Sequence, residues 1–289
     1  MSAGTTPLAL VYDFDGTLAG GNMQEYEFVP AIGMAKEEFW REVEELSTRH
    51  DADGILMYMM HMLDRAKTAN VSVRRDDFVR FGRSVELFPG VERWFDRIAV
   101  YAAEHNVALE HYIVSSGIRE MIEGTAIGDK FTRIYASSFV YDQNGVARWP
   151  ALAVNYTTKT QFLFRINKGT LAVSDSEMIN RYVPDAERPV PFSNIVFIGD
   201  GPTDVPCFRL MREKGGHAIA VYRPGTPDAR RVADELLRDG RIDSIAPADY
   251  RDGEPLDEIV KRIVDAIAAR AELARVVEAS NKTPNGRQK

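Results

Sequence analysis

The sequence predicts an α/β protein with a doubly wound parallel sheet and a small helical unit inserted after the first strand. Short apolar runs of strand length alternate with amphipathic helical stretches, an order that is typical of parallel strands joined by helices. The first apolar run, residues 8–13, is instead followed by a long stretch of helical periodicity, residues 24–85. No internal repeat and no linker between two independent domains is visible.

The composition indicates an ordinary cytoplasmic protein. The chain has 289 residues, of which 45% are hydrophobic, enough for one large domain and a smaller one. Its formal net charge of −7 argues against a nucleic-acid partner. The N-terminal residues lack the pattern of an export signal and no apolar run reaches about 18 residues, so we expect no membrane partner. The single cysteine, Cys207, fits a reducing compartment, and the oligomeric state stays open.

The first half of the chain predicts two strands with helices between them. Residues 8–13 form a near-continuous apolar run, as expected of a strand buried on both faces of a parallel sheet. Helical stretches follow until Pro89 and Gly90 interrupt them. Residues 90–105 predict a further amphipathic helix, and the apolar run 109–116 predicts the second strand.

The second half continues this alternation with one exception. Residues 133–154 contain two β-rich runs around Asn144-Gly145, the pattern of a hairpin. The remaining patterns indicate helices at 158–169, 203–216 and 257–279, and strands at 194–200 and 217–223. We predict a core domain of residues 1–21 and 88–280, a helical cap domain of residues 22–87, and a disordered tail at 281–289.

Acidic and polar residues lie at the predicted strand ends. Asp13 and Asp15 end the first strand, Ser115 ends the second, and Asp200 ends a later one. Ligands of doubly wound sheets bind beyond the carboxyl ends of the strands, so these residues should converge. Asp13 and Asp15 face the same side of an extended chain, where like charges repel unless a cation or a reaction employs them.

Such a set of residues suits phosphoryl transfer. A phosphoryl group repels a carboxylate nucleophile, so attack requires a hard divalent cation and donors around the phosphoryl oxygens. The aspartates can hold the cation. Ser115, Ser116 and Gly117 precede a predicted helix start, where hydroxyl and N–H groups can bind phosphate, and Lys159 can add a positive charge. The same residues could also serve only as turns and helix caps.

Four motifs, taken in order, resemble those of the haloacid dehalogenase superfamily of phosphotransferases. They are "DFDGT" from Asp13, "IVSSG" ending at Gly117, "TTKTQ" around Lys159 and "GDGPTD" at 199–204. The resemblance spans roughly residues 8–22 and 88–250 and implies a Rossmann-like core with a helical cap over the site. The second motif and the "IREMIEG" after it look closest to the phosphoserine phosphatase-like branch.

The resemblance also implies roles for the acidic residues. Asp13 would be the nucleophile that forms an aspartyl-phosphate intermediate. Asp15 would be the general acid for the leaving group and the base for the hydrolytic water. Mg²⁺ would be bound by the Asp13 carboxylate, the Asp15 backbone carbonyl and Asp200. Asp204 would support coordination or orient Lys159.

The roles of several supporting residues depend on where the fold places their side chains. Lys159 opens a predicted helix, as the lysine of the superfamily usually does, but Lys168 also lies between the second and fourth motifs. We expect Lys159 to face the phosphate, with Lys168 as the alternative. Gly16 and Gly201 are expected to permit tight backbone turns around the ion, and the Thr17 hydroxyl to position the Asp15 region.

The sequence therefore predicts a Mg²⁺-dependent phosphatase that acts on a small phosphorylated metabolite. Asp15 favours this activity. The dehalogenases of the superfamily lack an acid at that position, and its phosphonate-cleaving members generally lack one too. A phosphomutase and a non-catalytic protein that binds a phosphorylated ligand remain alternatives. The intact set of carboxylates, serine and lysine argues against the non-catalytic alternative.

The predicted cap would exclude water and favour small substrates. Asn22, Gln24 and Glu27 lie at its beginning and could contact the leaving group, although helix capping explains them equally well. The methionine-rich stretch 55–63 is expected to form the core of the cap, or otherwise an adaptable apolar surface.

Overall fold

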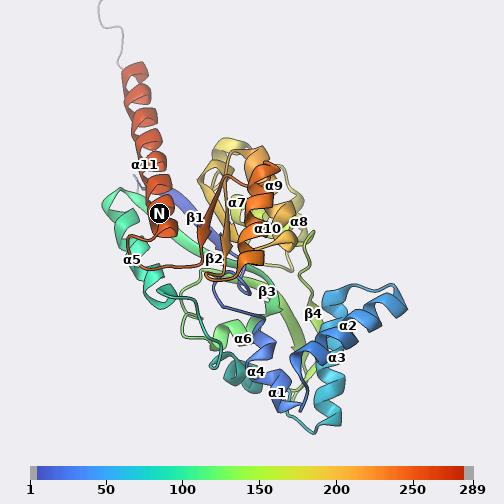
Figure 1. The fold of residues 1–289 in the computed structure, drawn as a ribbon. Helices are drawn as coiled ribbons and strands as arrows, with labels where there is room; N and C mark the ends of the chain where they lie inside the picture. The colour runs from blue at the N-terminus through green and yellow to red at the C-terminus, as the bar shows by residue number, and fades with distance from the viewer. Residues whose placement is uncertain (1–4, 283–289) are drawn as a thin grey trace, which may run out of the picture.

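A seven-stranded sheet forms the centre of the molecule (Figure 1). The computed structural model describes residues 5–282, and its strands run in the order β4-β3-β2-β1-β5-β6-β7. Six of these strands are parallel, and β4 runs antiparallel to β3. The strands are β1 (Thr6–Tyr12), β2 (Val107–Ile118), β3 (Arg133–Tyr141), β4 (Ala147–Leu152), β5 (Ile195–Gly199), β6 (His217–Tyr222) and β7 (Ser244–Pro247). This is the doubly wound α/β fold that the sequence predicts.

Helices cover both faces of the sheet, and β1 shows why its sequence is apolar throughout. Leu8, Leu10 and Tyr12 point to the face covered by α5 (Val91–Glu104) and α11 (Pro255–Lys282), while the residues between them point to the other face. That other face is covered by α7 (Lys159–Lys168), α9 (Val205–Lys214) and α10 (Pro227–Arg238). Burial on both faces holds β1 rigidly. The residues that follow it, beginning with Asp13, are therefore also held in a fixed position.

The segment between β1 and α5 is helical, as predicted. It contains η1 (Met23–Glu25), α1 (Phe28–Ala31), α2 (Lys36–His50), α3 (Gly54–Thr68) and α4 (Arg75–Gly82). Figure 1 shows α1 to α4 gathered at the end of the sheet toward which β4 extends, away from the free end of α11. In the methionine-rich helix α3, Met59 and Met62 are buried, as expected of the core of the insertion, whereas Leu56 and Met60 are exposed.

Two neighbouring linkers join this helical insertion to the rest of the chain. The N–H of Gly20 donates to the carbonyl of Glu86 at 3.4 Å, and the N–H of Phe88 donates to the carbonyl of Leu18 at 2.9 Å. The chain therefore leaves β1 and returns to α5 along one short antiparallel pair. These linkers lie only a few residues beyond Asp15.

The hairpin predicted around Asn144-Gly145 is confirmed. β3 and β4 pair antiparallel, and Gly145 takes a positive φ of 73° in the turn between them. The sequence does not show that the hairpin also contacts the helical insertion. The N–H of Arg75 donates to the carbonyl of Gly145 at 3.0 Å, and that of Ala147 donates to the carbonyl of Val73 at 2.9 Å.

A few elements differ from the prediction. α10 and β7 were not foreseen, because their sequences are short or largely polar. α11 continues through residues 281 and 282, which the prediction placed in a disordered tail, and residues 283–289 lie outside the described part of the chain. The shorter elements are α6 (Arg119–Gly124), α8 (Ser176–Asn180), η2 (Asp185–Glu187), η3 (Phe192–Asn194) and η4 (Pro202–Asp204). Within residues 5–282, no helix combines the length and apolarity needed to cross a membrane.

Candidate active site

Three aspartates meet at the carboxyl ends of β1 and β5. Asp13 directly follows the last residue of β1, and its N–H donates to the carbonyl of Ile198 in β5 at 2.9 Å. Asp200 follows β5, and Asp204, four residues later, directly precedes α9. One carboxylate oxygen from each aspartate lies within 4.8 Å of the others. The parallel sheet thus brings together acids that are almost 190 residues apart in the chain.

Lys159 links two of these acids. Its Nζ lies 2.6 Å from Asp13 Oδ2 and 2.7 Å from Asp204 Oδ1, and its side chain is completely buried. Burial by itself would lower the pKa of Lys159, but the charges of Asp13 and Asp204 outweigh it and raise the pKa. A permanently charged ammonium group therefore lies beside the candidate nucleophile.

Lys168 is placed elsewhere. Its Nζ donates to the carbonyls of Ile179 and Arg181, at 2.6 and 2.9 Å, near the other end of α7. The structure thus brings Lys159 and not Lys168 to the aspartates. α7 explains this outcome, because it begins at Lys159, close to the sheet edge, and ends at Lys168.

Both carboxylate oxygens of Asp204 already accept hydrogen bonds from the protein. Its Oδ1 accepts from Lys159, and its Oδ2 accepts from the N–H of Asp200 at 3.1 Å. Burial, and the nearby charge of Asp13, raise the pKa of Asp204 to about 6, against the opposing effect of Lys159. These contacts suit a residue that orients Lys159 and the Asp200 loop.

The remaining acids fit a divalent cation. Burial raises the pKa of Asp200, and the charges of Asp204 and Asp13 raise it further. Within this cluster three carboxylates face one ammonium group, so the site has an excess of negative charge in a poorly solvated place. Clustered carboxylate oxygens are the ligands that Mg²⁺ and other hard cations take.

Gly16 lets Asp200 approach the backbone beyond β1. Its φ is +77°, and a Cβ at this position would lie 2.2 Å from Asp200 Oδ2. Gly201 also begins a tight turn, because its carbonyl accepts from the N–H of Asp204 at 3.0 Å. This turn does not depend on glycine, since Gly201 has an extended backbone with φ of −157° and a Cβ there would meet no described atom within 4 Å.

Asp15 faces the beginning of the helical insertion. Its Oδ1 accepts from the N–H of Met23 at 2.9 Å. Burial raises the pKa of Asp15 well above its usual range, and the charge of Asp13 adds to this effect. A carboxyl group that keeps its proton can donate it to a departing oxygen.

The expected hydroxyl contact of Thr17 is not found. Thr17 is buried, and its Oγ1 has no hydrogen-bond partner among the described residues. Its carbonyl instead accepts from the hydroxyl of Tyr250 at 2.9 Å. Thr17 is therefore held through its backbone, and no hydroxyl contact of Thr17 positions the Asp15 region.

Ser115, Ser116 and Gly117, here called the Ser115 loop, lie within the last residues of β2, which continues to Ile118 beyond its predicted end, and the pairing of β2 with β3 shifts register there. Ser115 is buried, and its Oγ accepts from the N–H of Gly117 at 3.1 Å. The carbonyl of Ser116 accepts from the Tyr58 hydroxyl of α3 at 2.5 Å, so the helical insertion reaches this loop directly. Ser115, Ser116 and Gly117 thus lie between the sheet and the insertion.

Met23 is a neighbour of this loop that the sequence does not reveal. Its side chain is fully buried, and its Sδ accepts from the N–H of Ile118 at 3.2 Å. A Cβ on Gly117 would lie 2.2 Å from Met23 Cε and 3.0 Å from Asp15 Oδ2. An isolated methionine in a polar stretch is the only signal of this contact.

Of the candidates for leaving-group contact, two are occupied by other partners. Glu27 pairs with Arg80 at 2.6 Å. The side-chain amide of Asn22 donates to Glu25 Oε1 at 2.7 Å, although Asn22 also lines the cavity described next. Gln24 is buried, and its Oε1 has no hydrogen-bond partner among the described residues.

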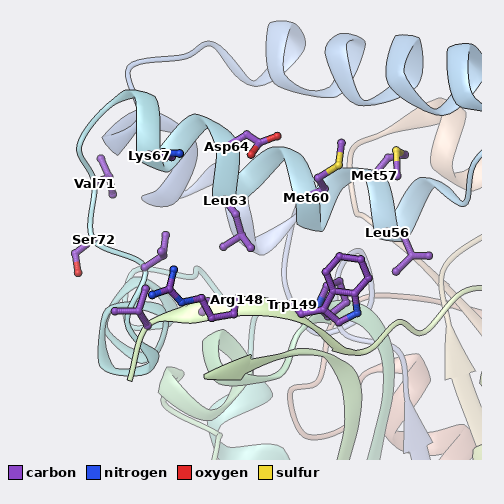
Figure 2. Close-up of a pocket in the computed structure, with 14 residues that line it drawn as sticks. Leu56, Met57, Met60, Leu63, Asp64, Lys67, Val71, Ser72, Arg148 and Trp149 are labelled. Atoms are coloured by element: carbon purple, nitrogen blue, oxygen red, sulfur yellow. The ribbon is translucent and has the colours of Figure 1, made fainter. Parts of the chain in front are cut away.

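A cavity of about 310 Å³ opens beside the acids. Its lining includes Asp15, Gly16 and Asp200. A larger cavity of about 670 Å³ lies elsewhere, between α3 and β4, and none of the predicted site residues lines it. Figure 2 shows this second cavity, with Leu56 and Leu63 pointing from α3 toward β4, which carries Arg148 and Trp149.

Known proteins resemble this chain in sequence and in fold. An uncharacterized protein of Borreliella burgdorferi is 31% identical over 280 residues, which cover 86% of this chain and 93% of that protein. A substrate-bound phosphoserine phosphatase is similar in fold, with 15% identity, coverage of 89% and 98%, and a TM-score of 0.53. A phosphoserine phosphatase in its apo form has 14% identity, the same coverage and a TM-score of 0.55.

The family itself follows from the sequence match and agrees with the geometry. The haloacid dehalogenase-like hydrolase family matches residues 10–209, which include Asp13, Ser115, Lys159 and Asp204. The similar folds of the phosphoserine phosphatases agree with this match. The chain belongs to the haloacid dehalogenase-like hydrolase family.

Proposed function

We propose that the protein is a Mg²⁺-dependent phosphatase that hydrolyses a small phosphorylated metabolite through a phosphoryl group carried on Asp13. The observation that carries this proposal is the buried contact of Lys159 with Asp13 and Asp204, next to Asp15 and Asp200. Family membership supports the same conclusion. The proposed localisation of the protein is cytoplasmic.

In the first step, a carboxylate oxygen of Asp13 attacks phosphorus. The bond from Asp13 to phosphorus forms while the bond from phosphorus to the ester oxygen breaks. Asp15 donates its proton to that oxygen, which leaves as an alcohol. Lys159 keeps a positive charge beside the attacking carboxylate throughout.

In the second step, water attacks phosphorus and releases Asp13. Asp15, now ionised, takes one proton from the water. The bond from Asp13 to phosphorus breaks, so the products are inorganic phosphate and the original carboxylate. Asp15 finishes the cycle protonated, ready for another ester.

The phosphate oxygens and the cation have separate ligands in this proposal. Mg²⁺ would be held by the carboxylates of Asp13 and Asp200 and the backbone carbonyl of Asp15. When bound, it supplies positive charge that offsets the repulsion between the nucleophile and the phosphoryl group. The loop of residues 115–117 supplies hydroxyl and N–H donors for the phosphate oxygens.

The helical insertion, residues 22–87, is proposed to act as the cap of a core formed by residues 1–21 and 88–280. Its contacts with the Ser115 loop through Tyr58 and with Asp15 through Met23 support this role. A cap in this place excludes water from the acids and limits the size of the substrate.

A phosphate-release assay tests the function. Purified protein is incubated with a chromogenic phosphate ester and a panel of phosphorylated metabolites, with and without Mg²⁺. We expect Mg²⁺-dependent release that Asp13→Asn abolishes, while the exposed control Asp228→Asn leaves it unchanged. Release by Asp13→Asn at the wild-type rate would overturn the assignment of the nucleophile. Absence of release with every ester and metal would favour a binding protein.

A further inference from the structure

Within the proposed function, the leaving group must lie against Asp15, which is its proton donor. One side of Asp15 is already filled. Met23 donates its N–H to Asp15 Oδ1, and its side chain is buried against Gly117, where even a Cβ would be 2.2 Å from Met23 Cε. A leaving group has no space to extend toward Gly117.

The other side of Asp15 opens into the cavity of about 310 Å³. This volume lies at the lower end of the range of small-molecule sites, which is about 300 to 1,000 Å³. Its lining also includes the end of β6 and the residues that follow, among them Tyr222 and Arg223. β6 therefore contributes to the same sheet edge as the strands that carry Asp13 and Asp200.

Acidic residues outnumber cationic ones in the lining of this cavity. Asp15, Asp200 and Glu25 are acidic, and Arg223 is the one cationic residue among the described residues of the lining. Glu25 is already satisfied, because its Oε1 accepts from Asn22 at 2.7 Å and from Trp40 at 2.8 Å. It offers no vacant acceptor at Oε1 for a ligand.

Arg223, by contrast, keeps most of its donors free. One guanidinium nitrogen of this exposed residue donates to the carbonyl of Gly20 at 3.0 Å, which ties the head group to the start of the helical insertion beside the cavity. Within the described chain, no carboxylate lies within ion-pair distance of Arg223. A guanidinium group has five N–H donors and binds carboxylate or phosphate through two parallel hydrogen bonds.

We propose that the leaving group of the substrate carries its own anionic group, a carboxylate or a second phosphate, and that Arg223 binds it. This inference rests on the proposed phosphatase function and adds the substrate class to it. Arg223 is a specificity-determining residue here, since it touches the far end of the substrate and not the reacting phosphorus. Without Arg223, an anionic leaving group would meet only acidic and neutral side chains in the cavity.

Three esters that differ only beyond the ester oxygen test the inference. They are carboxymethyl phosphate, ethylene glycol bisphosphate and 2-hydroxyethyl phosphate, whose leaving group is neutral. For the wild-type protein we expect kcat/KM to be about tenfold or more higher for one of the anionic esters, because a hydrogen bond to a charged group contributes roughly 10- to 100-fold. The preferred ester distinguishes the carboxylate from the phosphate.

The variants separate recognition from a structural role. Arg223→Ala should reduce the preference at least about tenfold, mainly through KM, and Arg223→Lys should restore part of it. Arg238→Ala, which removes an exposed arginine of α10 outside the cavity, should leave the preference unchanged. Equal losses on all three esters would overturn the inference and show that Arg223 only holds Gly20. The absence of any preference in the wild-type protein would overturn it as well.

Failure of the proposed function is recognised separately, as absence of phosphate release from all esters. Calorimetry then decides about Arg223 without turnover. We expect the wild-type protein to bind 3-phosphonopropionate or propane-1,3-bisphosphonate about tenfold more tightly than propylphosphonate, and Arg223→Ala to lose this difference. Equal affinities of the wild-type protein for all three phosphonates would overturn the inference.

Discussion

The ammonium group of Lys159 lies between Asp13 and Asp204, 2.6 Å from one carboxylate and 2.7 Å from the other. All three side chains are buried, so each charge depends on the others for its stability. Removing the lysine would leave two carboxylates facing each other with little solvent. The same contact that holds the fold therefore also prepares the candidate nucleophile.

Lys159→Met should abolish phosphatase activity and destabilise the protein. Breaking a buried ion pair from one side costs about 3 to 5 kcal/mol of unfolding free energy, because uncompensated charge remains. Urea denaturation and the phosphate-release assay measure the two effects. Lys168→Met is the matched control, since Lys168 binds only backbone carbonyls and should affect stability slightly and activity not at all. Wild-type activity in Lys159→Met would contradict the role given to this residue.

Asp200→Asn and Asp204→Asn should fail in different ways. Asp200→Asn removes a proposed ligand of Mg²⁺, so the Mg²⁺ concentration for half-maximal activity should rise. Asp204→Asn removes an anchor of Lys159 and of the Asp200 N–H, so kcat should fall at saturating Mg²⁺ by about 10- to 100-fold, as for other supporting residues of metal sites. Titration of activity with Mg²⁺ compares the variants. Identical Mg²⁺ dependence would mean that Asp200 is not a ligand.

Gly16→Ala and Gly201→Ala form a matched pair of substitutions. At Gly16 the φ of +77° and the distance of 2.2 Å to Asp200 Oδ2 leave no room for a methyl group. We expect Gly16→Ala to reduce kcat/KM at least about a hundredfold through displacement of Asp200. Gly201→Ala should keep most of the activity, because its backbone is extended and the space is open. The reverse ranking in a steady-state assay would contradict this account of the proposed metal-binding loop.

The stability of the fold should fall in mild acid because of His111. Burial lowers the pKa of His111 from 6.5 to about 4, and its neutral ring lies 3.1 Å from the Tyr12 hydroxyl. The unfolded chain takes up a proton below pH 6.5 that the folded protein accepts only near pH 4. His111 therefore contributes stability above pH 6.5 that is lost toward pH 4, by about 3 kcal/mol at most.

Unfolding free energies from urea denaturation at pH 7 and pH 4.5 check this prediction. His111→Gln should show a weaker loss of stability between these values than the wild-type protein. The exposed His50→Gln serves as the control and should keep the wild-type dependence. An unchanged dependence in His111→Gln would show that other groups cause the loss.

The architecture could be predicted because burial leaves a strong pattern in the sequence. β1 and β5 are apolar on both faces, and the turn at Asn144-Gly145 requires a positive φ that glycine adopts easily. β7 and α10 escaped prediction because β7 is four residues long and α10 is largely polar. The secondary structure of such segments is determined by packing against neighbouring elements. A local sequence pattern does not contain that information.

The acids of the site could be predicted for a related reason. Their places at strand ends follow from the fold, whereas the partner of a side chain depends on three-dimensional distance. The sequence favours Lys159 over Lys168 because Lys159 opens a predicted helix, and the start of α7 at the sheet edge brings Lys159 to the acids. Met23 and Arg223 were missed because nothing local distinguishes a residue that another segment will bring next to Asp15.

The paired linkers at Leu18 to Phe88 and Gly20 to Glu86 have a mechanical consequence. Because the two chain crossings are bound to each other, the start of the helical insertion keeps a fixed place beside the end of β1. Met23 lies just past these linkers, and its N–H donates to Asp15 Oδ1. A displacement of this start would remove the donor from the carboxyl group that is proposed to transfer the proton, so the position of the insertion and the hydrogen bonding of Asp15 depend on each other.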